Sequence, residues 1–234
     1  MKKFLRKVNR GLVLGGVLII GTTIYIIADL KNFEKEKPVV EQTITEYAQA
    51  VAKFNITPEK NREYNITLNK EDSQKLTADW QAIIDEYWID KKASANDIFY
   101  YYDDKSYLED SVISYIDNKQ RGYVTDISIN LSDCNVKKDG PNAAVVTCTS
   151  NVYYVGLENS AIFTPGGCNS YYTYFGNESP IDPKLMQTTF SENLTLYLEK
   201  KSDGWKITKS EVYDNYDVNV SKVQESDNES NSEN

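Results

Sequence analysis

The chain has 234 residues, a formal net charge of −9 and no histidine. Without histidine, Ser-His-Asp and Cys-His nucleophile systems are excluded, and so is nearly every catalytic zinc site, so we do not expect an enzyme. The excess of acidic residues argues against nucleic acid as a partner, because its phosphates would repel the protein.

A basic head, residues 1–10, precedes an uncharged apolar stretch, Gly11–Ala28. As a helix the stretch would extend about 27 Å, close to the hydrocarbon thickness of a bilayer. The head carries five bases and no acid, whereas all 35 acids of the chain follow the stretch. Because lysine and arginine beside a span stay in the cytoplasm, we predict one transmembrane helix over residues 11–28, with the N-terminus cytoplasmic and the remainder extracytoplasmic.

A cleavable signal peptide is the alternative interpretation of the same residues. Cleavage requires small residues at positions −3 and −1, and the best site, after Ala28, has Ile26 at −3. No cysteine follows the stretch directly, which excludes lipoprotein processing. We therefore favour an uncleaved single-pass anchor in the cell membrane.

The residues after the anchor predict a stalk and then an amphipathic helix. Residues 29–38 are polar and end at Pro38, which suits the first turn of a helix. The helix is predicted over residues 39–54, because its apolar residues recur at spacings of three and four: Val40, Ile44, Tyr47, Val51 and Phe54. Thr57 and Pro58 then predict one further helical turn, with Thr57 as its cap.

Two more helices are predicted before the pattern changes. The first covers about residues 70–90, with Asn69 as its cap and a buried face made of Leu76, Trp80, Ile83, Ile84 and Tyr87. The second is indicated by the capping box Ser106–Glu109 and ends at Gly122.

From Tyr123 the apolar residues alternate with polar ones, which predicts a strand. A turn over residues 137–142 and a returning strand over about 144–155 complete a hairpin. A loop of roughly 34 residues follows, and a short strand is predicted in it near residues 171–175.

A second hairpin turns at Asp203-Gly204. Its first strand alternates through leucines and its second carries Trp205 and Ile207 on one face. Residues 217–234 hold five acids and little to bury, so we predict a disordered acidic tail.

Helices followed by antiparallel strands predict an α+β domain over residues 39–216, in which the helices pack on a curved antiparallel sheet. This order of elements, together with the closing strand, turn and Trp205-Lys206-Ile207 motif, resembles the nuclear-transport-factor-two-like (cystatin-like cone) superfamily over about residues 39–215. A basic head, one span and such a domain outside also look like the inner-membrane assembly proteins of conjugation and type IV secretion machines.

The cone resemblance implies a position for Trp205. In cone domains that face of the closing hairpin turns toward the helices, so Trp205 is expected to pack near Tyr47 and Val51. Lys206 is expected to point the other way and to tolerate substitution.

No pattern in the chain predicts a catalytic residue, a cofactor or a metal. Acidic residues cluster near the third predicted helix, namely Asp103, Asp104, Glu109 and Asp110, but such a cluster at a helix start is typical of a solvated face. Enzymes of the cone superfamily usually place an aspartate, often with a histidine, between helices and sheet. This chain departs from that pattern because it has no histidine.

Cys134 and Cys148 flank the first hairpin turn symmetrically, as cross-strand neighbours do. Outside the cytoplasm a disulfide between them would close a loop of about 15 residues, which adds roughly 3 kcal/mol in the chain-entropy description. Pairings with Cys168 and three unpaired buried thiols are the alternatives.

The 18 tyrosines include two local concentrations. Tyrosine offers a flat apolar ring with a hydroxyl, which suits a binding surface for protein or sugar and equally suits packing at the rim of the domain. The residues concerned are Tyr100, Tyr101, Tyr102, Tyr171, Tyr172 and Tyr174.

These observations support three hypotheses for function. The first is a membrane-anchored structural or interaction protein of the bacterial cell envelope, with protein partners outside the membrane in a secretion or conjugation apparatus. The second is a membrane-anchored ligand-binding or sensor domain that uses the interior pocket of the cone. An enzyme is the third, and the missing histidine argues against it. An interior filled by tyrosine and tryptophan would favour the first hypothesis, and a deep interior pocket the second.

Overall fold

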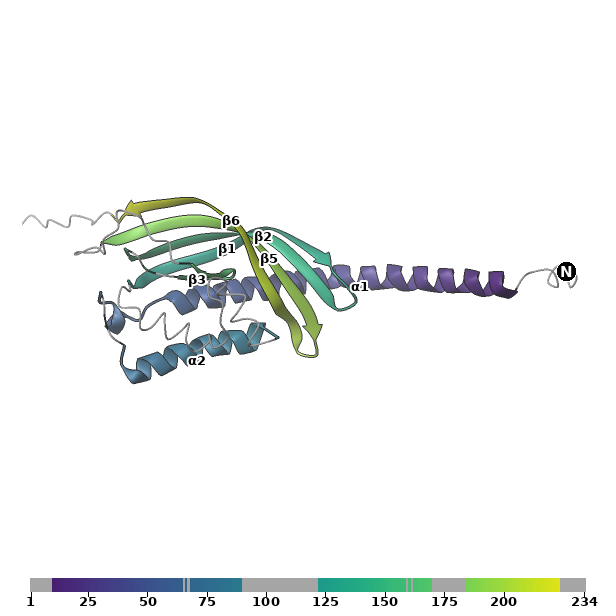
Figure 1. The fold of residues 1–234 in the computed structure, drawn as a ribbon, viewed down its shortest axis with the longest axis horizontal. Helices are drawn as coiled ribbons and strands as arrows, with labels where there is room; N and C mark the ends of the chain where they lie inside the picture. Colours follow the sequence, from purple (N-terminus) through teal and green to yellow (C-terminus); the bar gives the residue numbers. More distant parts are fainter. Residues whose placement is uncertain are drawn as a thin grey trace, which may run out of the picture.

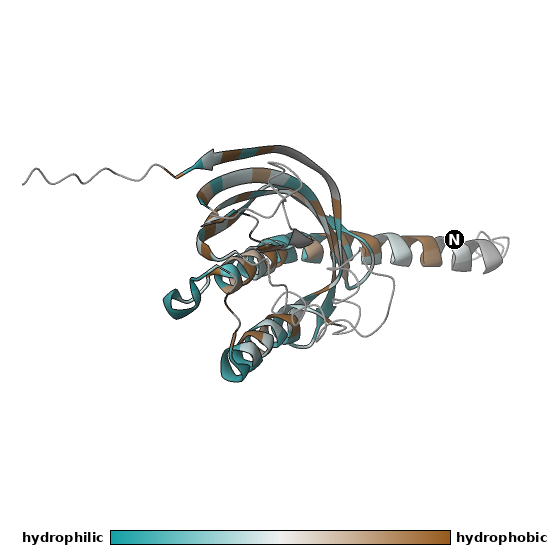
Figure 2. Cartoon of the chain, turned by 60° about the vertical axis from the view of Figure 1, so that its left-hand side comes forward, coloured by the Kyte–Doolittle hydropathy of each residue, from teal (hydrophilic) through white to brown (hydrophobic). Residues whose placement is uncertain are grey.

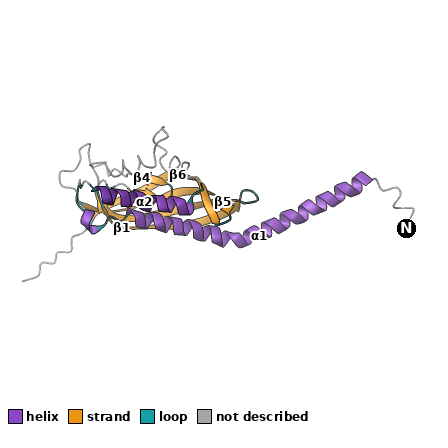
Figure 3. Ribbon diagram, turned by 90° about the horizontal axis from the view of Figure 1, so that it is seen from below, coloured by secondary structure: helices purple, strands orange, loops and turns teal. Residues whose placement is uncertain are grey.

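The computed structural model describes residues 10–89, 122–169 and 184–223, apart from positions 65, 67, 159 and 161. Within these ranges the chain forms an α+β domain, in which helices lie on one face of a curved antiparallel sheet (Figures 1 and 3). In chain order the elements are α1 (Arg10–Asn55), η1 (Glu59–Asn61), α2 (Lys70–Tyr87), β1 (Val124–Lys138), β2 (Ala143–Leu157), β3 (Ile162–Thr164), β4 (Gly167–Asn169), β5 (Leu185–Lys201) and β6 (Gly204–Lys222).

One helix, α1, runs without a break through the predicted span, the stalk and the first helix of the domain. The predicted helix start at Pro38 is therefore wrong, because Pro38 lies inside α1. A proline removes one backbone bond of a helix, but the turns around it are rich in lysine and glutamate, which favour helix. Phe33 and Val40 on either side of it are buried against the domain, and this packing holds the helix together.

The N-terminal half of α1 projects away from the domain (Figure 1). Brown, apolar segments mark this projecting part in Figure 2. Its large apolar side chains are each at least 50% exposed: Val17, Leu18, Ile19, Ile20, Ile24, Tyr25, Ile26 and Ile27. In the described part of the chain, no helix combines the length and the apolar character that crossing a membrane requires.

The helix predicted over about residues 70–90 is confirmed as α2, and its cap is Asn69 as expected. The Asn69 Oδ1 atom accepts a hydrogen bond from the backbone N–H of Asp72 at 2.9 Å. Trp80 and Ile84 are buried on the predicted face. The helix ends three residues earlier than predicted, because Trp88 adopts an extended backbone and pairs with Ile207 of β6.

The turn predicted at Thr57 and Pro58 is the short helix η1, but Thr57 does not cap it. The Thr57 N–H donates to the carbonyl of Val124 at 2.9 Å, and the Thr57 hydroxyl accepts from the Val124 N–H at 3.1 Å. Thr57 therefore ties the end of α1 to the start of β1. The third predicted helix, from residue 106, lies outside the described residues.

The sheet has the order β1-β2-β5-β6, and every neighbouring pair is antiparallel. Both predicted hairpins are confirmed, with turns between β1 and β2 and between β5 and β6. Burial alternates along β2 and β5, so one row of each strand faces the helices.

A β-bulge at Asp133 shifts the inward row of β1. Ile127 and Ile129 are buried before the bulge and Val136 after it, so the row changes from odd to even positions. The register confirms the shift, because Asp133 and the residue after it have no partner between Ser132 and Asn135. Asp133 has φ of 53°, a left-handed conformation that aspartate tolerates better than most residues.

The loop after β2 contains a small hairpin, β3 and β4, that the sequence did not predict. Its first strand is completely buried, which a loop of this composition does not suggest. Asn55, the last residue of α1, fixes it by accepting from the Phe163 N–H at 2.7 Å and donating to the Phe163 carbonyl at 2.8 Å. The strand predicted near residues 171–175 lies outside the described residues.

The predicted boundary of the disordered tail is wrong. Residues 217–222 belong to β6, which pairs with β5 as far as the match of Met186 with Lys222. The composition of this segment predicted disorder because it offers little to bury. Backbone pairing along a sheet edge does not require apolar side chains, and this is what orders the segment.

Trp205 packs on α1 as expected, but not near Tyr47 and Val51. Its ring meets Phe33 edge to face at a centroid distance of 6.3 Å, and its Nε1–H donates to Glu36 Oε2 at 3.2 Å. The position is wrong because Trp205 follows the hairpin turn directly, and this end of the hairpin contacts α1 at Phe33 and Glu36, next to the part of α1 that leaves the domain.

The prediction that Lys206 points away from the domain is also wrong. Lys206 is only 9% exposed, and its ammonium group donates to the backbone carbonyl of Glu86 and pairs with Asp203 at 3.3 Å. It therefore supplies a donor and a positive charge to the last turn of α2, where helix carbonyls are unpaired.

Candidate functional site

The space between the two helices and the sheet is the first place to look for a site, and aromatic rings pack against one another in it. Phe54 of α1, Trp80 of α2 and Phe163 of β3 form one cluster, with ring centroids 4.7 to 5.3 Å apart. Tyr47 contacts Tyr87 and Trp88 at centroid distances of 5.6 and 6.1 Å. These distances are those of direct ring packing.

The aromatic interior is not entirely apolar. Tyr47, Trp80 and Trp88 are almost completely buried, and among the described residues their hydroxyl and N–H groups have no hydrogen-bond partner. Burial raises the pKa of Tyr47 well above its usual value, and the neighbouring Trp88 indole offsets only part of that shift. Tyr47 is thus a neutral packing residue at any physiological pH.

A buried carboxylate, Glu192, lies on the inward row of β5. The Thr164 hydroxyl donates to Glu192 Oε1 at 3.3 Å, and Ser150 is its cross-strand neighbour on β2. The Ser150 hydroxyl is fully buried and has no partner among the described residues. Buried polar groups are usually paired, so this cluster is the second candidate site.

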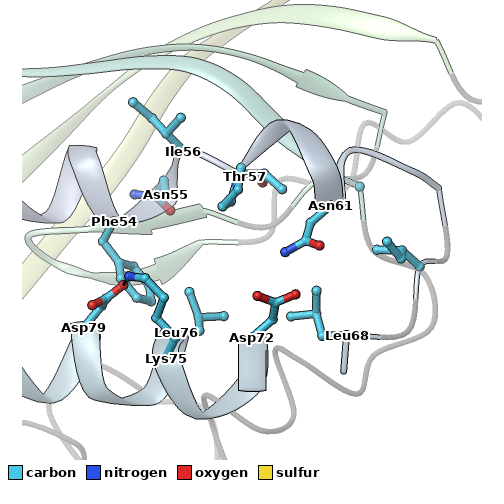
Figure 4. Close-up of a pocket in the computed structure, with 13 residues that line it drawn as sticks. Phe54, Asn55, Ile56, Thr57, Asn61, Leu68, Asp72, Lys75, Leu76 and Asp79 are labelled. Carbon is cyan, nitrogen blue, oxygen red and sulfur yellow. Dashed lines mark hydrogen bonds and ion pairs between the residues drawn. The ribbon is translucent and has the colours of Figure 1, made fainter. Parts of the chain in front are cut away.

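A cleft lies at the end of the domain opposite the projecting half of α1, between α1, η1 and α2. Its volume is about 710 Å³, which includes space that is open to solvent. Figure 4 shows the side chains that line it. Phe54, Leu68 and Leu76 form its apolar wall. Charged groups stand along its rim.

The charges of the cleft are satisfied within the protein. Lys60 binds Asp72 at 2.6 Å and holds the pKa of that carboxyl below its usual value, while Lys75 binds Asp79 at 2.5 Å. Among the described residues that line the cleft, the charged side chains are thus paired with each other or with a neighbouring residue, and none of them points to a charged ligand. Across the described residues, no three histidine, cysteine, aspartate or glutamate side chains come together as a metal site requires.

A third region joins the projecting half of α1 to the two hairpin turns. Lys138, at the end of β1, pairs with Asp29 of α1 at 2.6 Å, and its ammonium group lies 5.6 Å from the ring centre of Phe33. Lys200, at the end of β5, pairs with Glu36 at 2.7 Å. These contacts, with that of Trp205, hold both turns against α1 immediately after the apolar stretch ends at Ala28.

The strand register places Cys134 in the bulge opposite Cys148, and each thiol influences the pKa of the other. Both are free thiols in the structure. The backbone of Cys168 lies in β4, opposite Phe163. The disulfide between Cys134 and Cys148 stays a prediction.

The tyrosines predicted as a binding surface lie outside the described residues, as do the four clustered carboxylates. They are Tyr100, Tyr101, Tyr102, Tyr171, Tyr172 and Tyr174, with Asp103, Asp104, Glu109 and Asp110. The structure neither brings them together nor separates them.

Sequence reasoning missed Glu192, Asn55 and Phe33. Glu192 could have been found, because extending the Leu194 and Leu196 alternation by two residues places it on the same buried row. Phe33 stands alone among charged residues, and Asn55 is an amide at a helix end. Neither pattern predicts the tertiary contact that it makes.

No protein-family model and no curated protein matches the chain. Solved structures similar to it include the "Putative Scytalone Dehydratase" from Novosphingobium aromaticivorans, at 11% identity and a TM-score of 0.40, covering 83% of this chain and 93% of that one. Another is a "putative dehydratase from the NTF2-like family" of Streptomyces avermitilis, at 15% identity and a TM-score of 0.33, covering 82% and 99%. At these values the likeness carries no argument about function.

Proposed function

We propose that this protein is a membrane-anchored structural or interaction protein, in which residues 11–28 form the anchor and the α+β domain docks protein partners outside the cytoplasm. The observation that carries the proposal is the division of α1. Its C-terminal half is the centre of the domain core, whereas its N-terminal half exposes apolar side chains on every side. A helix that is apolar all round requires an apolar surrounding, and a bilayer supplies one.

The aromatic packing among the described interior residues supports docking rather than ligand capture. Tyr47, Trp80 and Phe163 occupy the space that a small ligand would need between helices and sheet. Ring packing at these described positions favours the outer surfaces for contact with other molecules. A role in the assembly of a secretion or conjugation apparatus agrees with this arrangement, in which one rigid helix carries a domain close to the membrane.

The contacts at the base of the domain support a fixed orientation. Asp29 follows the apolar stretch directly, and its ion pair with Lys138 holds the first hairpin turn at that level. In the proposed arrangement both hairpin turns face the membrane surface, and the cleft near Asp72 faces away from it. Partners are then met at the distal end and on the exposed face of α2.

Membrane fractionation of the full chain tests the proposal. The wild-type protein should stay in the membrane fraction after washing with alkaline carbonate. Replacing Ile19 and Ile20 by aspartate should release it, because the two changes add about 6 to 8 kcal/mol to the free energy of insertion. The matched control, Thr45→Asp with Gln49→Asp on the exposed face of the buried half, should leave the protein in the membrane.

Release of the wild-type protein by the carbonate wash would overturn the anchor. Orientation is tested separately, by adding protease to spheroplasts that contain a C-terminally tagged chain. The tag should be digested while a cytoplasmic marker survives. Full protection of the tag would place the domain in the cytoplasm and overturn the extracytoplasmic part of the proposal.

A second candidate function, a ligand-binding or sensor domain, is favoured by the cluster around Glu192. A carboxylate with no exposed surface is retained at a cost in stability unless its hydrogen bonds offset its desolvation. Replacing Glu192 by leucine distinguishes the two roles in chemical denaturation. A more stable variant would indicate that the carboxylate is kept for a ligand, and a destabilised one that it ties Thr164 of β3 to the sheet.

A further inference from the structure

The bulge at Asp133 has a chemical consequence for the residue that follows it. Had β1 continued without the bulge, the inward row would have stayed on odd positions, and Cys134 would have faced outward. The inserted residue turns Cys134 inward, onto the row that Val136 continues. Cys148 lies on the inward row of β2 and fills the gap in the register opposite the bulge.

The two cysteines lie opposite each other on the inward rows of β1 and β2. Cys148 is 6% exposed and belongs to the core, whereas Cys134 is half-buried and reachable from solvent. Each thiol influences the pKa of the other, and neither forms a disulfide in the structure. The Cys134 thiol also donates to the carbonyl of Ser132 at 3.9 Å. Positions opposite each other on adjacent strands, with both side chains on one inward row, are the arrangement from which a cross-strand disulfide can form without moving the backbone far.

We propose that Cys134 and Cys148 form a disulfide site, oxidised by thiol–disulfide exchange with a low-molecular-weight disulfide or with the disulfide of an oxidising protein. The proposal does not depend on the proposed function, because the two cysteines lie opposite each other whatever the domain binds. An oxidising compartment outside the cytoplasm would make the bond persist.

The exchange proceeds in two steps. The Cys134 thiolate, the more accessible one, attacks the oxidant disulfide, whose sulfur–sulfur bond breaks and releases one thiol. The Cys148 thiolate then attacks the Cys134 sulfur in the mixed disulfide and releases the second thiol. The pair loses two protons and two electrons, and the oxidant disulfide gains them as two thiols.

Burial slows this exchange in the folded protein. It raises the pKa of the Cys134 thiol and raises that of Cys148 to about 12. Only thiolates react. As long as the pH is below the pKa of the attacking thiol, the rate of exchange should therefore rise about tenfold for each unit by which the pH is raised. The closed bond joins β1 to β2 near the turn whose Lys138 binds Asp29 of α1.

The experiment uses the full chain in detergent, first reduced and then exposed to oxidised glutathione. Three single variants are compared with the wild type: Cys134→Ser, Cys148→Ser and, as the matched control, Cys168→Ser. Wild type and control should lose two hydrogen atoms in intact mass, and peptide mapping should recover one peptide pair joined through Cys134 and Cys148. Both serine variants within the site should lose this pair. Cys148→Ser keeps the accessible Cys134 thiol and should retain a glutathione adduct, whereas Cys134→Ser keeps only the buried Cys148 thiol of the pair and should react little.

The melting temperature and the peptide map of the wild type test the disulfide independently of the variants' mass. The oxidised wild type should melt at a higher temperature than the reduced protein, and the difference should vanish in both site variants. If the Cys168→Ser variant fails to fold, the peptide map of the wild type decides alone. Recovery of both thiols in alkylatable form after oxidation, or a crosslinked peptide that contains Cys168, would overturn the proposal.

Discussion

The two halves of α1 have the same secondary structure and opposite surroundings. In the C-terminal half, apolar residues form a stripe at spacings of three and four, and Val40, Ile44, Tyr47 and Val51 have no exposed surface. In the N-terminal half, Val17 to Ile20 are four consecutive apolar residues that point to all sides, and each is more than 60% exposed.

The two halves of α1 show that an apolar stripe and an all-round apolar surface need different surroundings to be buried. A stripe is satisfied by a protein surface on one side, which the sheet and β3 supply here. A helix apolar all round cannot be covered by one surface, so its burial depends on a surrounding medium. The boundary falls between Leu30, which is 49% exposed, and Phe33, which is 6% exposed, and the contacts with Lys138 and Trp205 begin at the same level.

The largest expected effect contrasts isoleucines from the two halves. Ile44→Ala should destabilise the full chain by about 2 to 5 kcal/mol, because it leaves a cavity among buried side chains. Ile20→Ala, the same chemical change in the exposed half, should alter the free energy of unfolding by less than about 0.5 kcal/mol. Chemical denaturation in a non-ionic detergent measures both. Equal effects would show that the exposed half is folded into the domain.

The second prediction asks whether exposure always means that a segment is dispensable. The end of β6 is exposed, yet its backbone pairs with β5 through residues 219–222. Truncation after Tyr216 should therefore lower the free energy of unfolding by roughly 1 to 3 kcal/mol, since several backbone hydrogen bonds are lost. Truncation after Val223 is the control and should be neutral. If neither truncation changes the free energy of unfolding, residues 217–222 do not contribute to the sheet and belong to the disordered tail.

Local patterns predicted the elements well because each depends on neighbouring residues. The spacing of Val40, Ile44 and Tyr47, the cap at Asn69 and the Asp203-Gly204 turn all gave elements that the structure contains. The α+β class followed from their order. Pro38 misled the interpretation, because a proline inside a helix is tolerated where packing on both sides is strong.

Tertiary positions could not be predicted in the same way. Trp205 was correctly predicted to pack on α1, but it contacts Phe33 and not the predicted Tyr47. Which turn of α1 it contacts depends on the length of the hairpin relative to the helix, and no local pattern encodes that length. The inward turn of Lys206 depends on where α2 ends. The bulge at Asp133 changes the phase of β1, and nothing in that segment except the aspartate itself indicates it.

The third prediction concerns the helix that covers the buried half of α1. Lys206→Ala should destabilise the domain by about 1 to 2 kcal/mol, because the carbonyl of Glu86 loses a charged donor at the end of α2. Lys201→Ala, on the same hairpin but exposed, should change the free energy of unfolding by less than about 0.5 kcal/mol. Urea denaturation compares them. If Lys206→Ala changes the free energy of unfolding as little as Lys201→Ala does, α2 is held to the domain by its apolar face alone.

The smallest expected effect lies at the boundary between the two halves, at Glu36. Its hydrogen bonds from Lys200 and Trp205 hold the pKa of its carboxyl below the usual value of 4.5. A carboxyl whose pKa is lower in the folded state stabilises the fold at a pH above its unfolded value, and that contribution is lost as the pH falls through the folded value. Because the group is largely solvated, the contribution should be a few tenths of a kcal/mol.

Comparing unfolding midpoints at neutral pH and near pH 3.5 measures this contribution. The wild type should lose slightly more stability on acidification than Glu36→Gln, which keeps the hydrogen bonds but cannot titrate. Glu63→Gln, an exposed glutamate away from the boundary, should behave as the wild type does. If Glu36→Gln loses as much stability as the wild type, the ion pair with Lys200 does not contribute, and the apolar contact of Phe33 with Trp205 alone fixes the turn against α1.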